Sequence, residues 1–205
     1  MLRLYVMDVS ALRADGEGYL LSAYRREKLQ KQRVEESRRQ GIGTDLLLRR
    51  ALFDFDAKLP WPVELRVNAF GKPEWALEGL HFNCSHSGRI AACALCDRPV
   101  GLDVQELTPY RESLVRRFFA PEEQALLARS NDRDRDFTRL WALKESWIKA
   151  IGTGLSTPLE AFSVIGEARP KAAFWHTERE GYAFALCVPG ADSAEPEIII
   201  VKSES

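Results

Sequence analysis

The segment FTRLWALKESWIKAIG at residues 137–152 decides the fold of the C-terminal part of this chain, and the short run GLDV at residues 101–104 comes before it. Helical spacing places an apolar stripe on one face of the longer segment, formed by Leu140, Leu143, Trp147 and Ile151. Glu145 and Lys149 lie four residues apart on roughly the opposite face. The sequence therefore predicts a helix that buries its stripe, presents two charges and stops at Gly152 and Gly154.

Shorter segments around this helix alternate between strand-like and helix-like patterns. Apolar or alternating runs predict strands at residues 2–9, 63–67, 81–87, 89–96, 100–104, 161–165, 171–177, 181–188 and 197–201. Helices are expected over residues 19–40 and 45–56, with a break at residues 41–44, and a further helix opens at Pro121. The hairpin-like spacing of the strands favours an α+β fold over regular βαβ alternation.

The composition fits an ordinary globular protein. With 205 residues, 45% hydrophobic content and ten Phe, the chain can bury a core as one domain or as two fused halves. The net charge of −1 gives no footprint for nucleic acid or a membrane surface. The N-terminus lacks the long apolar run of a secretory signal, and no segment approaches membrane-spanning length. We therefore expect a cytoplasmic protein without nucleic-acid or membrane partners.

A boundary between two halves is expected near residues 97–100, where Asp, Arg and Pro interrupt two apolar runs. The halves would then be residues 1–98 and 99–205. No repeat in the sequence itself relates one half to the other.

Asp103 lies inside the apolar run GLDV, where an unpaired charge would be costly. It is therefore either exposed at a strand end or held by a cation or a metal. Carboxylates from Asp103 and Glu145, with oxygens from a diphosphate and water, would make the octahedral site that Mg²⁺ prefers. The alternative for Glu145 and Lys149 is an ordinary ion pair on a solvated helix, because their order and spacing favour one.

Basic residues gather in the first expected helix. This helix holds three acids and seven basic residues, and the basic residues are Arg25, Arg26, Lys28, Lys31, Arg33, Arg38 and Arg39. They form either a solvated helix face or an edge that binds phosphate. The second interpretation gains weight if Lys72 and His86 converge on the same edge.

The cysteines resemble buried reduced thiols more than a disulfide framework, because Cys93, Cys96 and Cys187 lie in apolar segments. Cys93 and Cys96 would point to opposite faces of an extended strand, which argues against a shared site. A zinc site that also recruits Cys84 and His86 remains the alternative.

The order of motifs in the chain resembles that of one family, the surfactin-synthetase-type 4′-phosphopantetheinyl transferases. The motifs are FGKP at residues 70–73, FNCSHSGR at 82–89, GLDV at 101–104, RFFAPEE at 117–123 and WALKESWIKAIGTGLSTPLEAFSV at 141–164, and the resemblance runs from Lys28 to Val164. It implies two similar, pseudo-twofold-related α+β halves, each a small antiparallel sheet with packed helices, and an active site in the cleft between them.

The resemblance also implies an activity. Members of the family transfer the 4′-phosphopantetheine arm of coenzyme A to a serine of an apo acyl or peptidyl carrier protein, with Mg²⁺, and release 3′,5′-ADP. Carried over by motif, Asp103 and Glu145 would be Mg²⁺ ligands in the C-terminal half. Lys149 would contact the pyrophosphate of coenzyme A and assist the departing 3′,5′-ADP. Gln105 stands where many members have a third acidic ligand, so an amide oxygen or water would take that position.

The N-terminal half would contact the 3′-phosphate and the adenine of coenzyme A. The residues that the resemblance implies for coenzyme A are Lys28, Lys31, Gly71, Lys72, Pro73, Ser85 and His86, together with Lys149. The stretch between Lys31 and Asp45 is a few residues shorter than usual in the family. Arg38 or Arg39 is therefore expected to replace a phosphate contact.

Three functions fit these residues. The first is an active transferase, with Glu145 as the hypothetical base for the carrier serine. The second is a coenzyme A-binding protein with weakened or lost turnover, because Gln105 leaves the acidic metal site incomplete. The third is a metal-dependent nuclease built on Asp103, Glu145 and Lys149, which the lack of a broad basic footprint disfavours. A chain with both halves is expected to act as a monomer.

The segment RESLVRRFF at residues 111–119 predicts a basic and apolar helix. Carrier proteins of this family's reaction are typically acidic around the target serine, so such a helix suits them as a docking surface. The basic members are Arg111, Arg116 and Arg117, and the apolar members are Leu114, Phe118 and Phe119. The alternative is a half-buried amphipathic helix.

Overall fold

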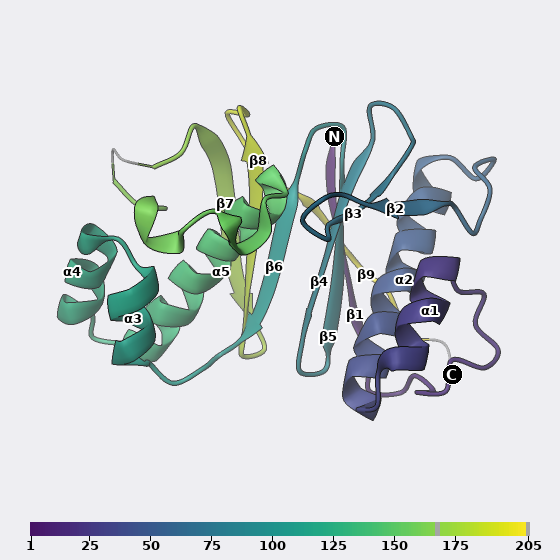
Figure 1. Cartoon of the computed structure of the whole chain (residues 1–205), viewed down its shortest axis with the longest axis horizontal. Coiled ribbons are helices and arrows are strands. Elements are labelled where there is room, and N and C mark those ends of the chain that lie inside the picture. The colour runs from purple at the N-terminus through teal and green to yellow at the C-terminus, as the bar shows by residue number, and fades with distance from the viewer. Residues whose placement is uncertain (167–168, 204–205) are drawn as a thin grey trace. The chain divides into compact units, whose positions relative to one another are not determined.

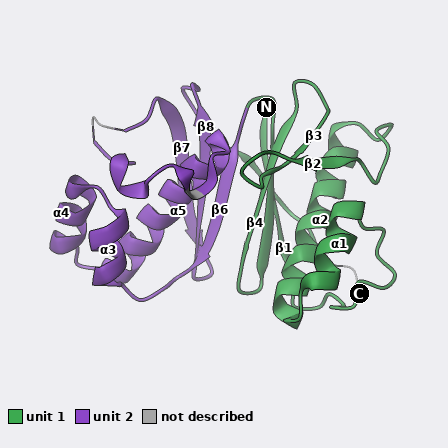
Figure 2. Ribbon diagram, viewed as in Figure 1, with its two compact units in different colours: residues 1–98, 196–205 green, residues 99–195 purple. Residues whose placement is uncertain are grey.

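The computed structural model describes residues 1–166 and 169–203, and these form two compact units (Figure 2). Unit 1 consists of Met1–Arg98 and the segment that begins at Pro196, and unit 2 is Pro99–Glu195. The expected assignment of residues 99–205 to one half is therefore wrong for the last segment. The reason is that this segment adds a strand to the sheet of unit 1.

Unit 1 is built on a four-stranded sheet with the order β4-β5-β1-β9. Its strands are β1 (Leu2–Asp8), β4 (His81–Ser87), β5 (Ile90–Cys96) and β9 (Glu197–Ile200). β5 is antiparallel to both β1 and β4, whereas β9 runs parallel to β1. Every residue of β5 is buried, as expected for an apolar strand in the middle of a sheet. The short strands β2 (Leu65–Val67) and β3 (Pro73–Trp75) form a separate hairpin.

One face of this sheet is covered by α2 (Glu35–Phe55), and α1 (Ala23–Lys31) packs against α2 (Figure 1). The expected break at residues 41–44 is wrong, because α2 continues through Gly41 and Gly43. A Cβ on Gly43 would lie 2.4 Å from Val9 Cγ1, and one on Gly41 would lie 2.5 Å from the Arg25 guanidinium. Both glycines are thus explained by close packing and not by a helix end.

Unit 2 has a three-stranded antiparallel sheet with the order β6-β8-β7. The strands are β6 (Gly101–Glu106), β7 (Ala172–Arg179) and β8 (Tyr182–Pro189). Its helices are α3 (Glu112–Phe118), α4 (Pro121–Arg129) and α5 (Arg133–Ile151), followed by the 3₁₀ turns η1 (Gly154–Ser156) and η2 (Leu159–Ala161). The helix predicted around residues 137–152 is therefore confirmed, and it begins four residues earlier.

The strand predicted at residues 161–165 is wrong. The 3₁₀ turn η2 ends there, and the amide of Val164 donates to the buried Glu123 Oε1 at 2.8 Å. The Glu123 carboxylate thus accepts the hydrogen bond that the Val164 amide would donate to a neighbouring strand in a sheet.

The two units share one topology that the sequence does not reveal. In unit 1, β1 is followed by the long helix α2 and then by the hairpin β4-β5, whose second strand pairs with β1. In unit 2, β6 is followed by α5 and the hairpin β7-β8, whose second strand pairs with β6. The predicted α+β class with two similar halves is confirmed at the level of each unit. In the described part of the chain, none of the helices combines the length and the apolar character that crossing a membrane requires.

Candidate functional site

The contact between β6 and α5 sets the geometry of the candidate site. Gly101, Asp103 and Gln105 alternate along β6 and share one of its faces. A Cβ on Gly101 would lie 1.9 Å from the Ser146 carbonyl oxygen, so α5 rests directly on the backbone of β6 at this point. The face that carries Asp103 therefore looks toward α5.

Asp103 is buried with 5% of its surface exposed, and it is held by a lysine of α5. The Lys149 ammonium donates to Asp103 Oδ1 at 2.5 Å, and the Lys149 side chain is 28% exposed. Lys149 thus pairs with Asp103 on the strand and also acts electrostatically on Glu145 of its own helix. Of the sequence alternatives for Asp103, the structure selects the buried carboxylate held by a cation.

Glu145 lies near this pair and is partly buried on α5. Burial raises the pKa of Glu145 above its ordinary value, the charge of Asp103 raises it further, and Lys149 lowers it. Two carboxyl groups thus repel each other here, and the Lys149 ammonium offsets part of this repulsion. A divalent cation would remove that repulsion, so the donor set fits the Mg²⁺ that the sequence resemblance implies.

The third expected metal ligand, Gln105, lies two residues beyond Asp103 on the same face of β6. It lines a pocket of about 320 Å³ together with Thr108, Arg111 and Trp141. Among residues 1–166 and 169–203, no three Asp, Glu, His or Cys side chains are grouped in a way that could hold a metal. A metal bound at Asp103 and Glu145 would need oxygens from an amide, from water or from a substrate to complete its shell.

In unit 1, the expected 3′-phosphate lysines lie on α1 and are engaged locally. The Lys28 ammonium lies 4.6 Å from the centre of the Tyr24 ring, and Lys31 donates to Glu27 Oε1 at 2.6 Å. The Lys31 and Glu27 side chains are 73% and 68% exposed, so an incoming anion can replace this weak pair.

The expected adenine-side residues lie in the β2–β3 hairpin. Gly71 has a positive φ of 86° in its turn, and Pro73 begins β3. Burial lowers the pKa of Lys72, and Glu74 partly opposes this. Burial lowers the pKa of His81, and the positive charge of Lys72 lowers it further. These effects place Lys72 near the start of β4.

Ser85 and His86 are consecutive residues of β4, and their side chains therefore point to opposite faces of the sheet. Ser85 is buried with 6% exposed and His86 is exposed. The structure does not bring these two side chains together on one face, although the resemblance assigns both to phosphate.

The two arginines expected to replace a phosphate contact hold the fold instead. Arg38 donates to the carbonyl oxygens of Ala14 at 2.6 Å and Leu29 at 2.5 Å, which satisfies acceptors around the end of α1. Arg39 donates to the Leu12 carbonyl oxygen at 3.0 Å and to Glu35 at 2.8 Å. Their positions correct the idea that either one is a spare phosphate contact.

Sequence reasoning missed a buried ion pair next to Glu145. Lys144 donates to Glu123 Oε2 at 2.7 Å and to the Phe162 carbonyl oxygen at 2.7 Å, and the two charged side chains are 1% and 0% exposed. Glu123 also accepts from the amide of Ala120 at 2.9 Å. Glu123 follows Pro121 at the start of a predicted helix, so its role in capping that helix could have been inferred from the sequence. Nothing in the spacing indicated that Lys144 is its partner.

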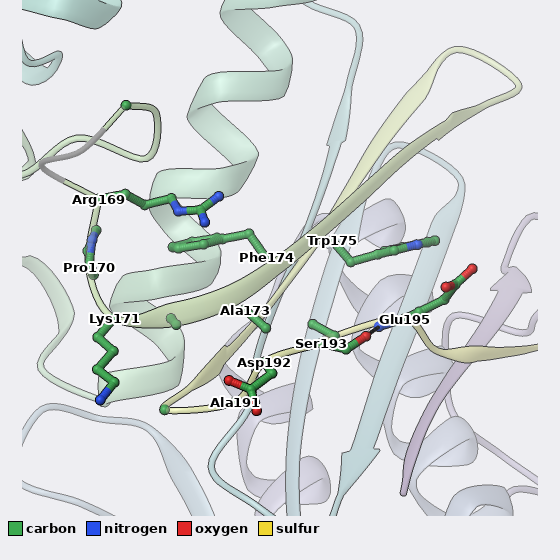
Figure 3. Close-up of a pocket in the computed structure, with 14 residues that line it drawn as sticks. Arg169, Pro170, Lys171, Ala173, Phe174, Trp175, Ala191, Asp192, Ser193 and Glu195 are labelled. Atoms are coloured by element: carbon green, nitrogen blue, oxygen red, sulfur yellow. Dashed lines mark hydrogen bonds between the residues drawn. The ribbon is translucent and has the colours of Figure 1, made fainter.

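A separate pocket of about 710 Å³ in unit 2 lies beside the start of β7 and residues 190–195 (Figure 3). Arg169 lies 5.8 Å from the centre of the Phe174 ring, and Trp175 and Glu195 also line the pocket. Its described lining contains none of the predicted site residues and mixes acids with bases, so it indicates no class of ligand.

Comparisons with known proteins agree with the motif order. The model of the 4′-phosphopantetheinyl transferase superfamily matches residues 99–188. A 4′-phosphopantetheinyl transferase of Bacillus subtilis is 39% identical over 147 residues, which are 70% of this chain and 66% of that protein. The 4′-phosphopantetheinyl transferase Sfp of Bacillus subtilis (strain 168) is 35% identical over 150 residues, again 70% of this chain and 66% of the relative.

A third relative extends the match along the chain. The 4′-phosphopantetheinyl transferase ffp of Bacillus subtilis is 34% identical over 200 residues, which are 90% of this chain and 89% of that protein. The matched region thus spans just under two thirds of the first two relatives and most of the third. With Asp103, Glu145 and Lys149 gathered where β6 meets α5, the chain belongs to the 4′-phosphopantetheinyl transferase family, in its surfactin-synthetase-type branch.

Proposed function

We propose that this chain transfers the 4′-phosphopantetheine arm of coenzyme A to a serine of an apo acyl or peptidyl carrier protein and releases 3′,5′-ADP. The observation that carries the proposal is the group of Asp103, Glu145 and Lys149 at the contact of β6 with α5. Two carboxyl groups and one ammonium at a partly buried site suit a reaction at a diphosphate, where negative charge must be offset. Coenzyme A, as substrate, supplies that diphosphate.

Mg²⁺ is the proposed metal, with Asp103 and Glu145 as its ligands and Gln105 as a further candidate. When bound, it would offset charge on the diphosphate oxygens. Lys149 already carries a hydrogen bond to the buried carboxylate of Asp103, so its ammonium is fixed at the metal side of the site. There it would neutralise or protonate the departing 3′,5′-ADP.

Glu145 is the proposed base for the serine hydroxyl. A carboxylate in water is a weak base, but burial and the charge of Asp103 raise the pKa of Glu145. That pKa belongs to the metal-free protein, so in the reaction Glu145 would accept the proton directly or through a metal-bound water. In unit 1, we propose that Lys28, Lys31, Ser85 and His86 contact phosphate and that Gly71, Lys72 and Pro73 lie at the adenine.

Carrier docking is proposed on α3, with a smaller set of residues than the sequence suggested. Arg116 and Arg117 lie in the last turn of α3, and the Arg117 guanidinium lies 4.9 Å from the centre of the Phe118 ring. Arg116 pairs with Glu112 at 2.5 Å, and both side chains are largely exposed. Phe119 is only 1% exposed and belongs to the core, so it is removed from the expected surface.

The test incubates the purified chain with Mg²⁺, coenzyme A and an apo carrier protein, and it measures the intact mass of the carrier. Transfer adds one phosphopantetheine arm to the carrier, and chelation of Mg²⁺ should abolish this gain. The second candidate function, coenzyme A binding without turnover, rests on Gln105 in place of an acid. It would be supported instead if calorimetry detected coenzyme A binding while none of several apo carriers gained mass.

A further inference from the structure

Two cysteines lie directly opposite each other in the sheet of unit 1. Cys84 on β4 pairs in register with Cys93 on β5. The strands are joined by a two-residue turn, Gly88 and Arg89, so Ser87 and Ile90 form the first, hydrogen-bonded pair of the hairpin. Pair types alternate along an antiparallel ladder, and the fourth pair, Cys84 with Cys93, is of the closer, non-hydrogen-bonded type.

The spacing of such a pair suits a disulfide. Opposite Cα atoms of a non-hydrogen-bonded pair are about 4.5 Å apart, inside the roughly 4.4–6.8 Å that disulfides span. The Cβ atoms are normally about 4.5–5.5 Å apart and would have to approach to about 3.8 Å. A bond formed here would therefore be strained and readily reduced.

The two thiols differ in accessibility. Cys93 is 0% exposed, whereas Cys84 is only partly buried. A hydrogen bond with the Cys84 thiol raises the pKa of Cys93, and burial raises it further. Cys84 also donates to the Thr44 carbonyl oxygen on α2 at 3.9 Å. One thiol thus belongs to a partly exposed residue of the edge strand β4, and the second lies in contact with it in the core.

The remaining cysteines cannot compete for either sulfur. Cys96 is three residues from Cys93 on β5 and points to the other face of the sheet. Cys187 is buried in β8 of unit 2, where burial raises its pKa to about 12. The geometry therefore singles out one pair among the four cysteines.

We propose that Cys84 and Cys93 form a dithiol site that a low-molecular-weight disulfide converts into an intramolecular disulfide. The Cys84 thiolate attacks one sulfur of the small disulfide, which gives a mixed disulfide and releases one thiolate. That thiolate takes up the proton of Cys93, and the Cys93 sulfur attacks the Cys84 sulfur and releases the second small thiolate. This second thiolate takes up the proton that Cys84 lost at the start. Two protein thiols are oxidised by two electrons, and one small disulfide is reduced to two thiols. The site does not depend on the proposed transferase activity.

The test exposes the reduced, full-length protein to oxidised glutathione, blocks remaining thiols with N-ethylmaleimide after denaturation, and maps the cysteines by peptide mass spectrometry. The expected product lacks two hydrogen atoms, carries a Cys84–Cys93 link, and is modified by N-ethylmaleimide at Cys96 and Cys187. Dithiothreitol should restore both thiols. Recovery of Cys84 and Cys93 both blocked by N-ethylmaleimide would overturn the proposal, as would stable glutathione on Cys84 in the unmutated protein.

Two variants sharpen this result. In Cys93→Ala, Cys84 should accumulate as the mixed disulfide with glutathione, because the second thiol is gone. In Cys84→Ser, Cys93 should stay unmodified by glutathione, because it is buried. Glutathione on Cys93 in the second variant would contradict the assigned order of attack. The mapping of the unmutated protein decides the proposal even if a variant fails to fold.

Discussion

The buried pair of Lys144 and Glu123 makes a quantitative prediction about stability. Both side chains are almost fully buried, at 1% and 0% exposed, and Lys144 Nζ donates to Glu123 Oε2 at 2.7 Å. The substitution Lys144→Met keeps the length of the apolar chain but leaves the Glu123 carboxylate without its cation. Removing one partner of a buried ion pair costs about 3–5 kcal/mol. The Ala120 and Val164 amides still donate to Glu123, so we expect the lower part of this range, about 3 kcal/mol.

Urea unfolding followed by circular dichroism measures this cost as a fall in the midpoint at constant slope. The matched control is Lys31→Met, since Lys31 pairs with Glu27 at 2.6 Å in an i, i+4 geometry at an exposed site. That control should lose less than about 0.5 kcal/mol. The double variant Glu123→Gln with Lys144→Met carries no buried charge, and it should be less destabilised than the sum of the two single variants.

A loss below about 1 kcal/mol in Lys144→Met would refute this account, because it would mean that the carboxylate is not left uncompensated in the core. Strict additivity in the double variant would refute it as well, since two groups in direct contact must couple.

Glu145, Gly101 and the arginines of α3 give further predictions. Glu145→Gln should abolish transfer to the carrier while coenzyme A still binds in calorimetry, and full turnover in this variant would remove Glu145 as the base. The folded-state pKa of Glu145 is raised above its ordinary value. Between these two pKa values, the folded protein binds more protons than the unfolded protein. The free energy of unfolding therefore falls as the pH rises through this window. The metal-free Glu145→Gln variant should therefore be more stable above that window than the unmutated protein, and Mg²⁺ should raise the melting temperature of the unmutated protein alone. Gly101→Ala should cost about 1–3 kcal/mol, because its Cβ would lie 1.9 Å from the Ser146 carbonyl oxygen; an unchanged urea midpoint would show that α5 does not rest on β6. Reversal of charge at Arg116 and Arg117 should raise the KM for the carrier without a change in coenzyme A affinity, and unchanged carrier kinetics would reject α3 as the docking helix.

The strand β6 and the helix α5, which carry the candidate site, could be predicted from the sequence because each has a strong local pattern. The run around Asp103 is short and apolar, and the segment around Glu145 has a clear stripe at helical spacing. Motif order then supplied the proposed roles of Asp103, Glu145 and Lys149, whereas helical spacing alone would have indicated a surface ion pair of Glu145 with Lys149.

Other features depend on tertiary contacts that no local pattern encodes. Gly41 and Gly43 look like a helix end in sequence, yet they lie inside α2, where a Cβ on Gly43 would meet the Val9 side chain. Residues 161–165 have a strand-like composition, but Glu123 takes the amide that a sheet would need. Lys144 looks like one more exposed helix lysine, and its partner lies 21 residues away.

The placement of β9 bears on how the chain is made. Arg3 of β1 and Glu197 of β9 form an ion pair across a separation of 194 residues, so the β1–β9 ladder closes a loop that contains all of unit 2. On the ribosome, β1 is synthesised first and β9 only after all of unit 2, so the edge of β1 stays unpaired until the whole of unit 2 has been made. Contacts so distant along the chain are slow to form. The pairing of β9 with β1 is therefore expected to be a late step in the folding of unit 1.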